Sequence, residues 1–250
     1  MSILTEGGNI WPDTHGFDQA HAKSLKATID KYLEGTGLEA YPIGSAATPT
    51  PGKISGDFDV LVDMGQAMKT FGTQDPKEAR IALEKFLQQK GLDTRRIAVT
   101  VHTKVPFNNH YHQVDIKVVN NAQQVAKYHT HDLPKGSPYK GVHKQLVMNA
   151  LATSQGLLWS PDEGLYKRDA AGKKAELLST DFDEIAKALL GPKANAASLG
   201  SVESILAAIP DEARRNEIFN IAKNSKSWPA EPTPVGTNEW FRRLIDKMII

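Results

Sequence analysis

The sequence predicts an α/β (α+β) fold, in which a small mixed sheet is flanked by helices, followed by a smaller, mostly helical C-terminal unit. Strand-like and helix-like patterns alternate over residues 1–155, whereas residues 156–250 carry mainly helical patterns. The chain has 250 residues, of which 40% are hydrophobic and 24% charged, so it can bury a sizeable core. We therefore expect two domains, residues 1–155 and 156–250.

The elements of the first domain follow from periodicity and from helix start and stop signals. Apolar residues at helical spacing predict a helix over 14–34, ended by Gly35 and Gly37. Asp75-Pro76 predicts another helix start, because Asp caps helices and Pro suits their first position. The remaining elements are strands at 38–43, 57–62, 97–105 and 114–118, and a helix that begins at Ser137-Pro138 and buries Val142, Leu146, Val147, Ala150 and Leu151.

The second domain is expected to open with a short hairpin over 157–167 and to continue as helices. A proline-rich segment, Trp228–Pro234, predicts a stiff, extended linker before the last helix. The four expected helices cover residues 181–190, 201–208, 211–223 and 237–248.

Composition excludes several classes of protein. Cysteine is absent, which rules out disulfides, thiolate zinc sites and cysteine nucleophiles. We find no apolar run near the ~20 residues needed to span a bilayer, and no signal-peptide pattern at the N-terminus. We therefore expect a cytoplasmic protein without a membrane partner. The net charge of +1 argues against binding nucleic acid mainly by non-specific electrostatics.

Three aspartates carry the strongest chemical signal. Asp57 and Asp59 lie two residues apart on an expected strand, so they share one of its faces. Asp115 lies between Val114 and Ile116 on a later strand. If these strands are neighbours, like charges about 4 Å apart repel by roughly 4 kcal/mol at an effective dielectric near 20. Ligands that are all oxygen atoms favour Mg²⁺ or Mn²⁺, and such ions suit phosphoryl transfer. The alternative interpretation is that the three aspartates only occupy exposed positions on their strands.

A glycine-serine pair precedes the first two aspartates by eleven residues. Gly44 lets the backbone approach a ligand closely, and Ser45 offers an N–H and a hydroxyl to a phosphate oxygen. A simple turn is the alternative for each residue taken alone. Ordered before Asp57-Phe-Asp59, the pair favours a nucleotide site.

Three short segments, taken in order, resemble the signature of the polymerase-beta-like nucleotidyltransferase superfamily. They are Ile43-Gly44-Ser45, Asp57-Phe58-Asp59-Val60 and Val114-Asp115-Ile116. The resemblance covers roughly residues 20–155. It implies that Asp57 and Asp59 bind the metals of an incoming nucleoside triphosphate, that Asp115 binds the metal activating the attacking hydroxyl, and that Gly44 and Ser45 hold the triphosphate.

A weaker resemblance covers the following stretch. This stretch is similar to the end of the palm and the thumb of family X DNA polymerases. The segments that carry the similarity are Ser137–Ala152, Gly156–Trp159, Gly164-Leu165 and a helix over 180–190. The texture also resembles small nucleotidyltransferases encoded by bacteriophages, which implies a host cytoplasm. The N-terminal modules of family X polymerases have no room before a helix near residue 14, which counts against gap-filling synthesis.

Positive side chains after the third aspartate suggest where a triphosphate or an acceptor backbone binds. Lys140, His143 and Lys144 lie at the start of an expected helix. These side chains either bind phosphate or only form a solvated helix start. His102 shares a strand face with Lys104, on a strand expected beside Asp115. From Lys117 to Val147 the chain has five lysines and one acid, and either a solvated surface or a phosphate-facing surface fits this excess. The lysines are Lys117, Lys127, Lys135, Lys140 and Lys144.

The predicted reaction transfers a nucleoside monophosphate from an NTP or dNTP to an acceptor hydroxyl, with Mg²⁺ or Mn²⁺ as cofactor. A nucleic-acid 3′ end is the first expected acceptor, because of the local lysines and the thumb-like tail. A protein or a small molecule is the alternative acceptor. A catalytically inactive relative, acting as a binding or virion-associated component, is the competing class.

Overall fold

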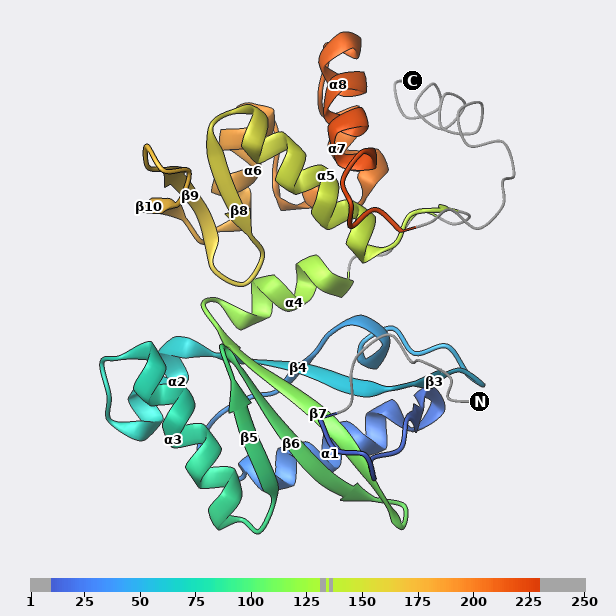
Figure 1. Cartoon of the computed structure of the whole chain (residues 1–250), viewed down its shortest axis with the longest axis vertical. Coiled ribbons are helices and arrows are strands. Elements are labelled where there is room, and N and C mark those ends of the chain that lie inside the picture. Colours follow the sequence, from blue (N-terminus) through green and yellow to red (C-terminus); the bar gives the residue numbers. More distant parts are fainter. Residues whose placement is uncertain (1–9, 131–133, 135–136, 230–250) are drawn as a thin grey trace. The chain divides into compact units, whose positions relative to one another are not determined.

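The computed structural model describes residues 10–130, 134 and 137–229. The chain divides into two compact units, Met1–Thr130 and His131–Ile250 (Figure 1). This division falls earlier in the chain than the expected boundary after residue 155. The separate roles expected for the two domains stay predictions.

The first unit is built on a five-stranded mixed sheet, which confirms the expected α/β class. The strand order is β2-β4-β7-β6-β5, in which β4 and β7 are parallel and all other pairs are antiparallel. Figure 1 labels β4, β7, β6 and β5 of this sheet. A second pair, β1 (Phe17–Asp18) and β3 (Ile54–Ser55), is antiparallel. The sheet strands are β2 (Tyr41–Pro42), β4 (Asp57–Asp63), β5 (Asp93–Ile97), β6 (Thr100–Phe107) and β7 (His110–Val119).

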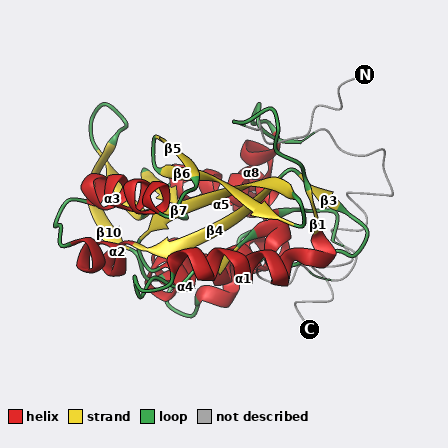
Figure 2. Cartoon of the chain, turned by 90° about the horizontal axis from the view of Figure 1, so that it is seen from below, coloured by secondary structure: helices red, strands yellow, loops and turns green. Residues whose placement is uncertain are grey.

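Helices cover one face of this sheet and bury its apolar side chains. Helix α3 (Pro76–Gln89) packs on β5 and β6, and α1 (Ala22–Leu33) contacts β6 (Figure 2). Helix α2 (Met64–Phe71) packs on α3, and α4 (Ala122–Thr130) contacts β2, β4 and β7. Because strand side chains alternate between faces, filling one face with apolar residues leaves the intervening polar residues on the other. The buried set includes Phe58, Val60, Val62, Val114, Ile116 and Val118 from the strands, with Leu25, Ile29, Leu83 and Leu87 from the helices.

The first helix is shorter than the periodicity predicts. It begins at Ala22, and the expectation of a helix over 14–21 is wrong. Phe17–Asp18 instead pairs with Ile54–Ser55, and a single 3₁₀ turn, η1 (Gln19–His21), leads into α1. A Cβ atom on Gly16 would lie 2.6 Å from the Ser55 carbonyl oxygen, so this close approach of two backbones needs glycine.

The strand expected over 97–105 is wrong as one element. Ile97 ends β5 and Thr100 begins β6, with Ala98 in the left-handed region at φ 52° between them. Ile97 and Val99 are 55% and 49% exposed, because they lie at the hairpin turn rather than on a buried strand face. Ile97 and Val99 therefore continue the apolar-polar alternation of β6 into the turn, and this made the predicted strand too long at its start. By contrast, β4 and the α3 start at Asp75-Pro76 match their predictions, whereas α2 and α4 were not predicted.

The second unit combines helices with a three-stranded antiparallel sheet of order β10-β9-β8. Strands β8 and β9 form the expected hairpin, and β10 adds a third strand that the sequence did not indicate. Helices α6, α7 and α8 lie within a residue of their predicted starts, whereas the helix expected over 237–248 and most of the expected linker lie outside the described residues. The elements are α5 (Gly141–Ser154), β8 (Leu157–Ser160), β9 (Gly164–Arg168), β10 (Lys174–Ser179), α6 (Phe182–Leu190), η3 (Ala196–Leu199), α7 (Val202–Ala207) and α8 (Glu212–Lys223).

Helix α5 begins at Gly141, so the start expected at Ser137-Pro138 is wrong. The Ser137 hydroxyl donates to the Glu203 carboxylate of α7, and Lys140 takes the position that precedes the helix. Val142 is 43% exposed, so it does not belong to the buried face. In the part of the chain that is described, no helix has the length and apolar character needed to cross a membrane.

Candidate active site

Parallel pairing of β4 with β7 brings the three aspartates onto one face of the sheet. Asp59 lies directly opposite Asp115, and Asp57 lies opposite Gln113. All three aspartates are partly buried, while their neighbours in both strands fill the core on the opposite face. The sequence argument depended on the two strands being neighbours, and they are.

The carboxylates disturb one another electrostatically. Burial, followed by the charges of Asp59 and Asp115, raises the pKa of Asp57 to about 6. Burial also raises the pKa of Asp59, although the positive charge of Lys117 opposes the rise. The Lys117 Nζ atom lies 3.6 Å from the Asp59 Oδ1 atom. Negative charge is thus concentrated here beyond what one lysine balances.

Asp115 is held by two hydrogen bonds that end on the same oxygen. The Nδ1 atom of His102 lies 2.8 Å from Asp115 Oδ1, and the Nε2 atom of Gln113 donates to that oxygen over 3.0 Å. Because a carboxylate only accepts, Nδ1 of His102 carries the proton in this contact. His102 lies directly opposite Asp115 in the β6–β7 ladder, which confirms the expected neighbourhood of these strands.

The donor set suits a hard divalent cation. The three carboxylates provide only oxygen ligands, which favours Mg²⁺ or Mn²⁺. Burial, and then the charges of Asp59 and Asp115, raise the pKa of Asp57, and a bound cation would offset the part that comes from these charges. Within the described ranges, no three His, Asp or Glu side chains are close enough together to hold one ion by themselves. Such an arrangement fits Mg²⁺ sites in which one or two carboxylates bind and substrate phosphates complete the coordination.

Gly44 and Ser45 lie beside the carboxylate strand. The Ile43 N–H donates to the Asp59 carbonyl over 3.1 Å, so the 3₁₀ turn η2 (Gly44–Ala46) begins next to β4. Gly44 adopts φ 58°, a left-handed conformation that glycine tolerates without strain. The structure therefore brings this pair to the aspartates, and its contact with a triphosphate stays a prediction.

The loop after η2 is tied down by Gln19, a residue that the sequence analysis did not single out. The Gln19 side-chain oxygen accepts from the Thr50 N–H over 2.7 Å, and its amide nitrogen donates to Ser55 Oγ over 2.7 Å. The Ser55 hydroxyl in turn donates to Ser45 Oγ over 2.8 Å. Because Gln19 is only 7% exposed, this network holds the loop from its buried side.

The expected basic cluster belongs to the second unit, whereas the aspartates belong to the first. The Nδ1 atom of His143 accepts from the Lys140 N–H over 2.9 Å, and its ring packs against Trp228 with centroids 4.7 Å apart. Lys144 is 3% exposed, and burial lowers its pKa to about 8. These contacts show a structural role for His143, and Lys144 is buried, while nucleotide binding by the cluster stays a prediction.

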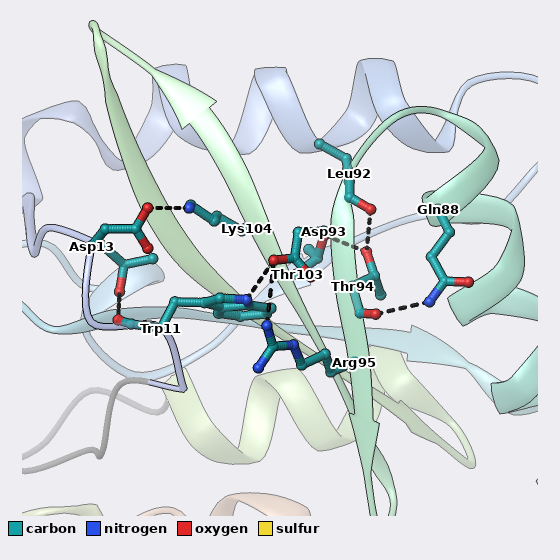
Figure 3. Close-up of polar contacts among 10 residues, drawn as sticks. Trp11, Asp13, Gln88, Leu92, Asp93, Thr94, Arg95, Thr103 and Lys104 are labelled. Atoms are coloured by element: carbon teal, nitrogen blue, oxygen red, sulfur yellow. Dashed lines mark hydrogen bonds and ion pairs between the residues drawn. The ribbon is translucent and has the colours of Figure 1, made fainter.

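An N-terminal segment, residues 10–15, crosses β5, β6 and β7, and we call it the strap. Its Trp11 Nε1 atom donates to Asp93 Oδ2 over 2.7 Å, and the Arg95 guanidinium lies 5.1 Å from the Trp11 ring centroid (Figure 3). Asp13 pairs with Lys104 on β6 (Figure 3). In the sequence, the strap is marked only by Trp11, an aromatic residue before the first helix.

The comparisons with known proteins find structural neighbours only. No protein-family model and no curated protein matches the sequence. A ternary P/T complex of polymerase beta from Leishmania infantum is similar with TM-score 0.46 and 17% identity, over 73% of this chain and 76% of that one. A ternary gap complex of that polymerase gives TM-score 0.44 and 16% identity, over 87% of this chain and 71% of the other. With TM-scores below 0.5, this likeness assigns no function to the chain.

Proposed function

We propose that this protein is a nucleotidyltransferase, which transfers a nucleoside monophosphate from an NTP or dNTP to an acceptor hydroxyl. The observation that carries the proposal is the register of β4 and β7, in which Asp59 faces Asp115 and Asp57 lies on the same face. Three partly buried carboxylates on one face, beside a glycine-serine turn, form an arrangement suited to binding a triphosphate through a divalent cation.

Each residue of the site has a distinct role in the proposal. Asp57 and Asp59 would hold Mg²⁺ or Mn²⁺ against the triphosphate, and Asp115 would bind the metal that activates the acceptor hydroxyl. The cation would neutralise charge that develops on the phosphoryl oxygens and promote loss of the hydroxyl proton. The turn at Gly44 and Ser45 would orient the triphosphate through its N–H groups and the serine hydroxyl. His102 and Gln113 hold one oxygen of Asp115 in place.

A nucleic-acid 3′ end is the acceptor that we favour. Arg95, Lys104 and Lys117 lie on the strand face that carries Asp115, as the ladder registers require. Arg95 is 54% exposed on its side chain and therefore accessible to a phosphate. A protein hydroxyl or a small molecule is the alternative acceptor, and the experiment below distinguishes them.

The test is label transfer. The chain is incubated with each labelled nucleoside triphosphate, with Mg²⁺ or Mn²⁺, and with DNA, RNA, protein and small-molecule acceptors. We expect labelled product and pyrophosphate only when metal is present. Asp57→Asn, Asp59→Asn and Asp115→Asn should each lower the rate by more than about 100-fold, since losing only an outer-shell partner of a metal costs 10–100-fold.

Asp63→Asn is the matched control. Asp63 lies on the same strand and face, but its Oδ1 atom accepts from the Gln66 N–H at the start of α2, and the Asn amide oxygen can accept this bond too. Asn would lose only the long contact of 3.4 Å between Oδ2 and the Ala122 N–H. We expect this variant to keep its activity. Full activity in Asp115→Asn would show that the site is assigned wrongly.

A second candidate is a catalytically inactive binding protein. The Lys117 Nζ atom, 3.6 Å from Asp59 Oδ1, already gives one carboxylate a cationic neighbour, as expected of a site that works without metal. This candidate predicts triphosphate binding that does not depend on metal, and no label transfer to any acceptor.

A further inference from the structure

The strap is linked to Asp115 through a single side chain, Gln113. The Ile10 N–H donates to Gln113 Oε1 over 2.8 Å, and Gln113 Nε2 donates to Asp115 Oδ1 over 3.0 Å. Gln113 is 2% exposed, so water does not compete for these bonds. The two bonds connect backbone at residue 10 with a proposed metal ligand far along the chain.

The two partners fix which way the Gln113 amide points. A backbone N–H can only donate and an ionised carboxylate can only accept, so the amide oxygen must face Ile10 and the amide nitrogen must face Asp115. Rotating the amide by half a turn would place donor against donor and acceptor against acceptor. Ile10 thereby determines that a donor faces Asp115.

Both donors to Asp115 use the same oxygen. His102 and Gln113 approach Oδ1, and no described residue forms a hydrogen bond or ion pair with Oδ2. A carboxylate held by one oxygen keeps its other oxygen for a cation. Since an amide is neutral, Gln113 orients Asp115 without adding charge to the cluster.

The strap is itself anchored at several points. Besides the Trp11 and Asp13 contacts, the His15 N–H donates to the Tyr111 carbonyl over 2.8 Å, and His112 Nδ1 donates to the His15 carbonyl over 2.8 Å. Trp11 is 3% exposed. An anchored strap can hold the Ile10 N–H at a fixed position over β7.

We propose that the strap is a positioning element of the active site, which acts through Gln113 to hold Asp115 in the orientation that binds the metal. The inference rests on the proposed function, because it assumes that Asp115 is a metal ligand. Ile10 and Gln113 are positioning residues and do not touch the substrate. Residues before the first helix would therefore contribute to catalysis.

Two variants of the full chain test the relay. Gln113→Met keeps the length of the side chain and removes both hydrogen bonds, whereas Ile10→Pro removes the donating N–H and fixes φ at residue 10. Gln88→Met and Ile10→Val are the matched controls: the exposed Gln88 side chain bonds the Thr94 carbonyl, and Val keeps the N–H. Each chain is assayed for Mn²⁺ affinity by electron paramagnetic resonance, for kcat and KM in label transfer, and for its unfolding midpoint.

We expect Gln113→Met to weaken Mn²⁺ binding and lower kcat by about 10- to 100-fold, with KM for the triphosphate within about twofold. Ile10→Pro should change the same two quantities in the same direction by several-fold, and both controls should match the wild type. If Gln113→Met does not fold, Ile10→Pro decides the question alone.

Other outcomes separate the two proposals. Wild-type Mn²⁺ affinity and kcat in Ile10→Pro, with an active wild-type chain, would overturn the relay and leave the proposed function standing. A loss confined to KM would also overturn it, since the strap would then serve triphosphate binding. A wild-type chain that neither binds Mn²⁺ nor transfers label would overturn the proposed function, and the relay with it.

Discussion

At the residue scale, the site is defined by charges that the fold places close together. Asp57 has a pKa of about 6, mainly through burial and then through Asp59 and Asp115. The sequence could place Asp57 and Asp59 on one face, because alternation along a strand is local, whereas Asp115 joins them through the pairing of β4 with β7. It could not reveal Gln113 or Gln19, since the partners that give these amides their roles are distant in the chain.

The raised pKa of Asp57 predicts how stability depends on pH. A carboxyl group whose folded pKa lies above its unfolded value of 3.8 binds its proton more tightly when folded. The contribution of Asp57 to the free energy of unfolding is fully present below about pH 4 and is lost as the pH rises through about 6. Allowing for solvent screening, we expect a loss of about 1 kcal/mol in the free energy of unfolding.

Urea unfolding without divalent metal, from about pH 4 to pH 7, measures this loss. Asp57→Asn should lack it, so the difference between the two chains should grow with pH in that window. Equal pH profiles for the two chains would show that Asp57 is not perturbed as described.

At the element scale, segments with strong local signals were predicted and segments defined by remote pairing were not. Helix α3 begins at its predicted cap, because Asp75 accepts from the Lys77 N–H over 2.8 Å. The start of α1 was wrong because β1 pairs with β3, a contact that periodicity does not encode. Strand β5 was not predicted, and the strand expected from Ile97 starts before β6 because Ile97 and Val99 continue the alternation of β6 into the turn.

The loop between η2 and β4 carries a second prediction. Gln19→Met removes the bonds to Thr50 and Ser55, which frees the network that ends at Ser45. If this loop holds the triphosphate, KM for the triphosphate should rise by about tenfold, consistent with a loss of 1–3 kcal/mol for a buried polar contact, while kcat changes less.

Steady-state label transfer measures both constants, and Gln66→Met, at an exposed position of α2, serves as the control. An unchanged KM in folded Gln19→Met would separate the loop from triphosphate binding.

At the scale of the whole molecule, the described lysines of the lysine-rich stretch lie in different environments. Lys117 lies beside Asp59 in the first unit, and Lys144 is buried in the second. Lys127 and Lys140 are exposed, and Lys135 lies outside the described residues. With 30 Lys and Arg residues against 29 Asp and Glu residues, the chain as a whole carries almost no net positive charge to attract a nucleic-acid backbone.

This distribution predicts a shallow salt dependence for a nucleic-acid acceptor. Each phosphate contact to a single strand contributes about −0.7 to the slope of log affinity against log salt concentration, so about four contacts give about −3. We expect a slope no steeper than this, measured by fluorescence anisotropy with a labelled oligonucleotide. A slope near zero would point to a protein or small-molecule acceptor.

The parallel pairing of β4 with β7 also bears on how the chain reaches its native state. Strands β5, β6 and β7 follow one another as antiparallel neighbours, so they can pair soon after they meet. Strand β4 must instead close a long loop to dock beside β7, and such non-local pairing is slow. We therefore expect Asp59 and Asp115 to meet only after β4 has docked beside β7. An early folding intermediate that contains the β5–β6–β7 meander would lack the cluster, and its electrostatic repulsion would be absent from the first steps of folding.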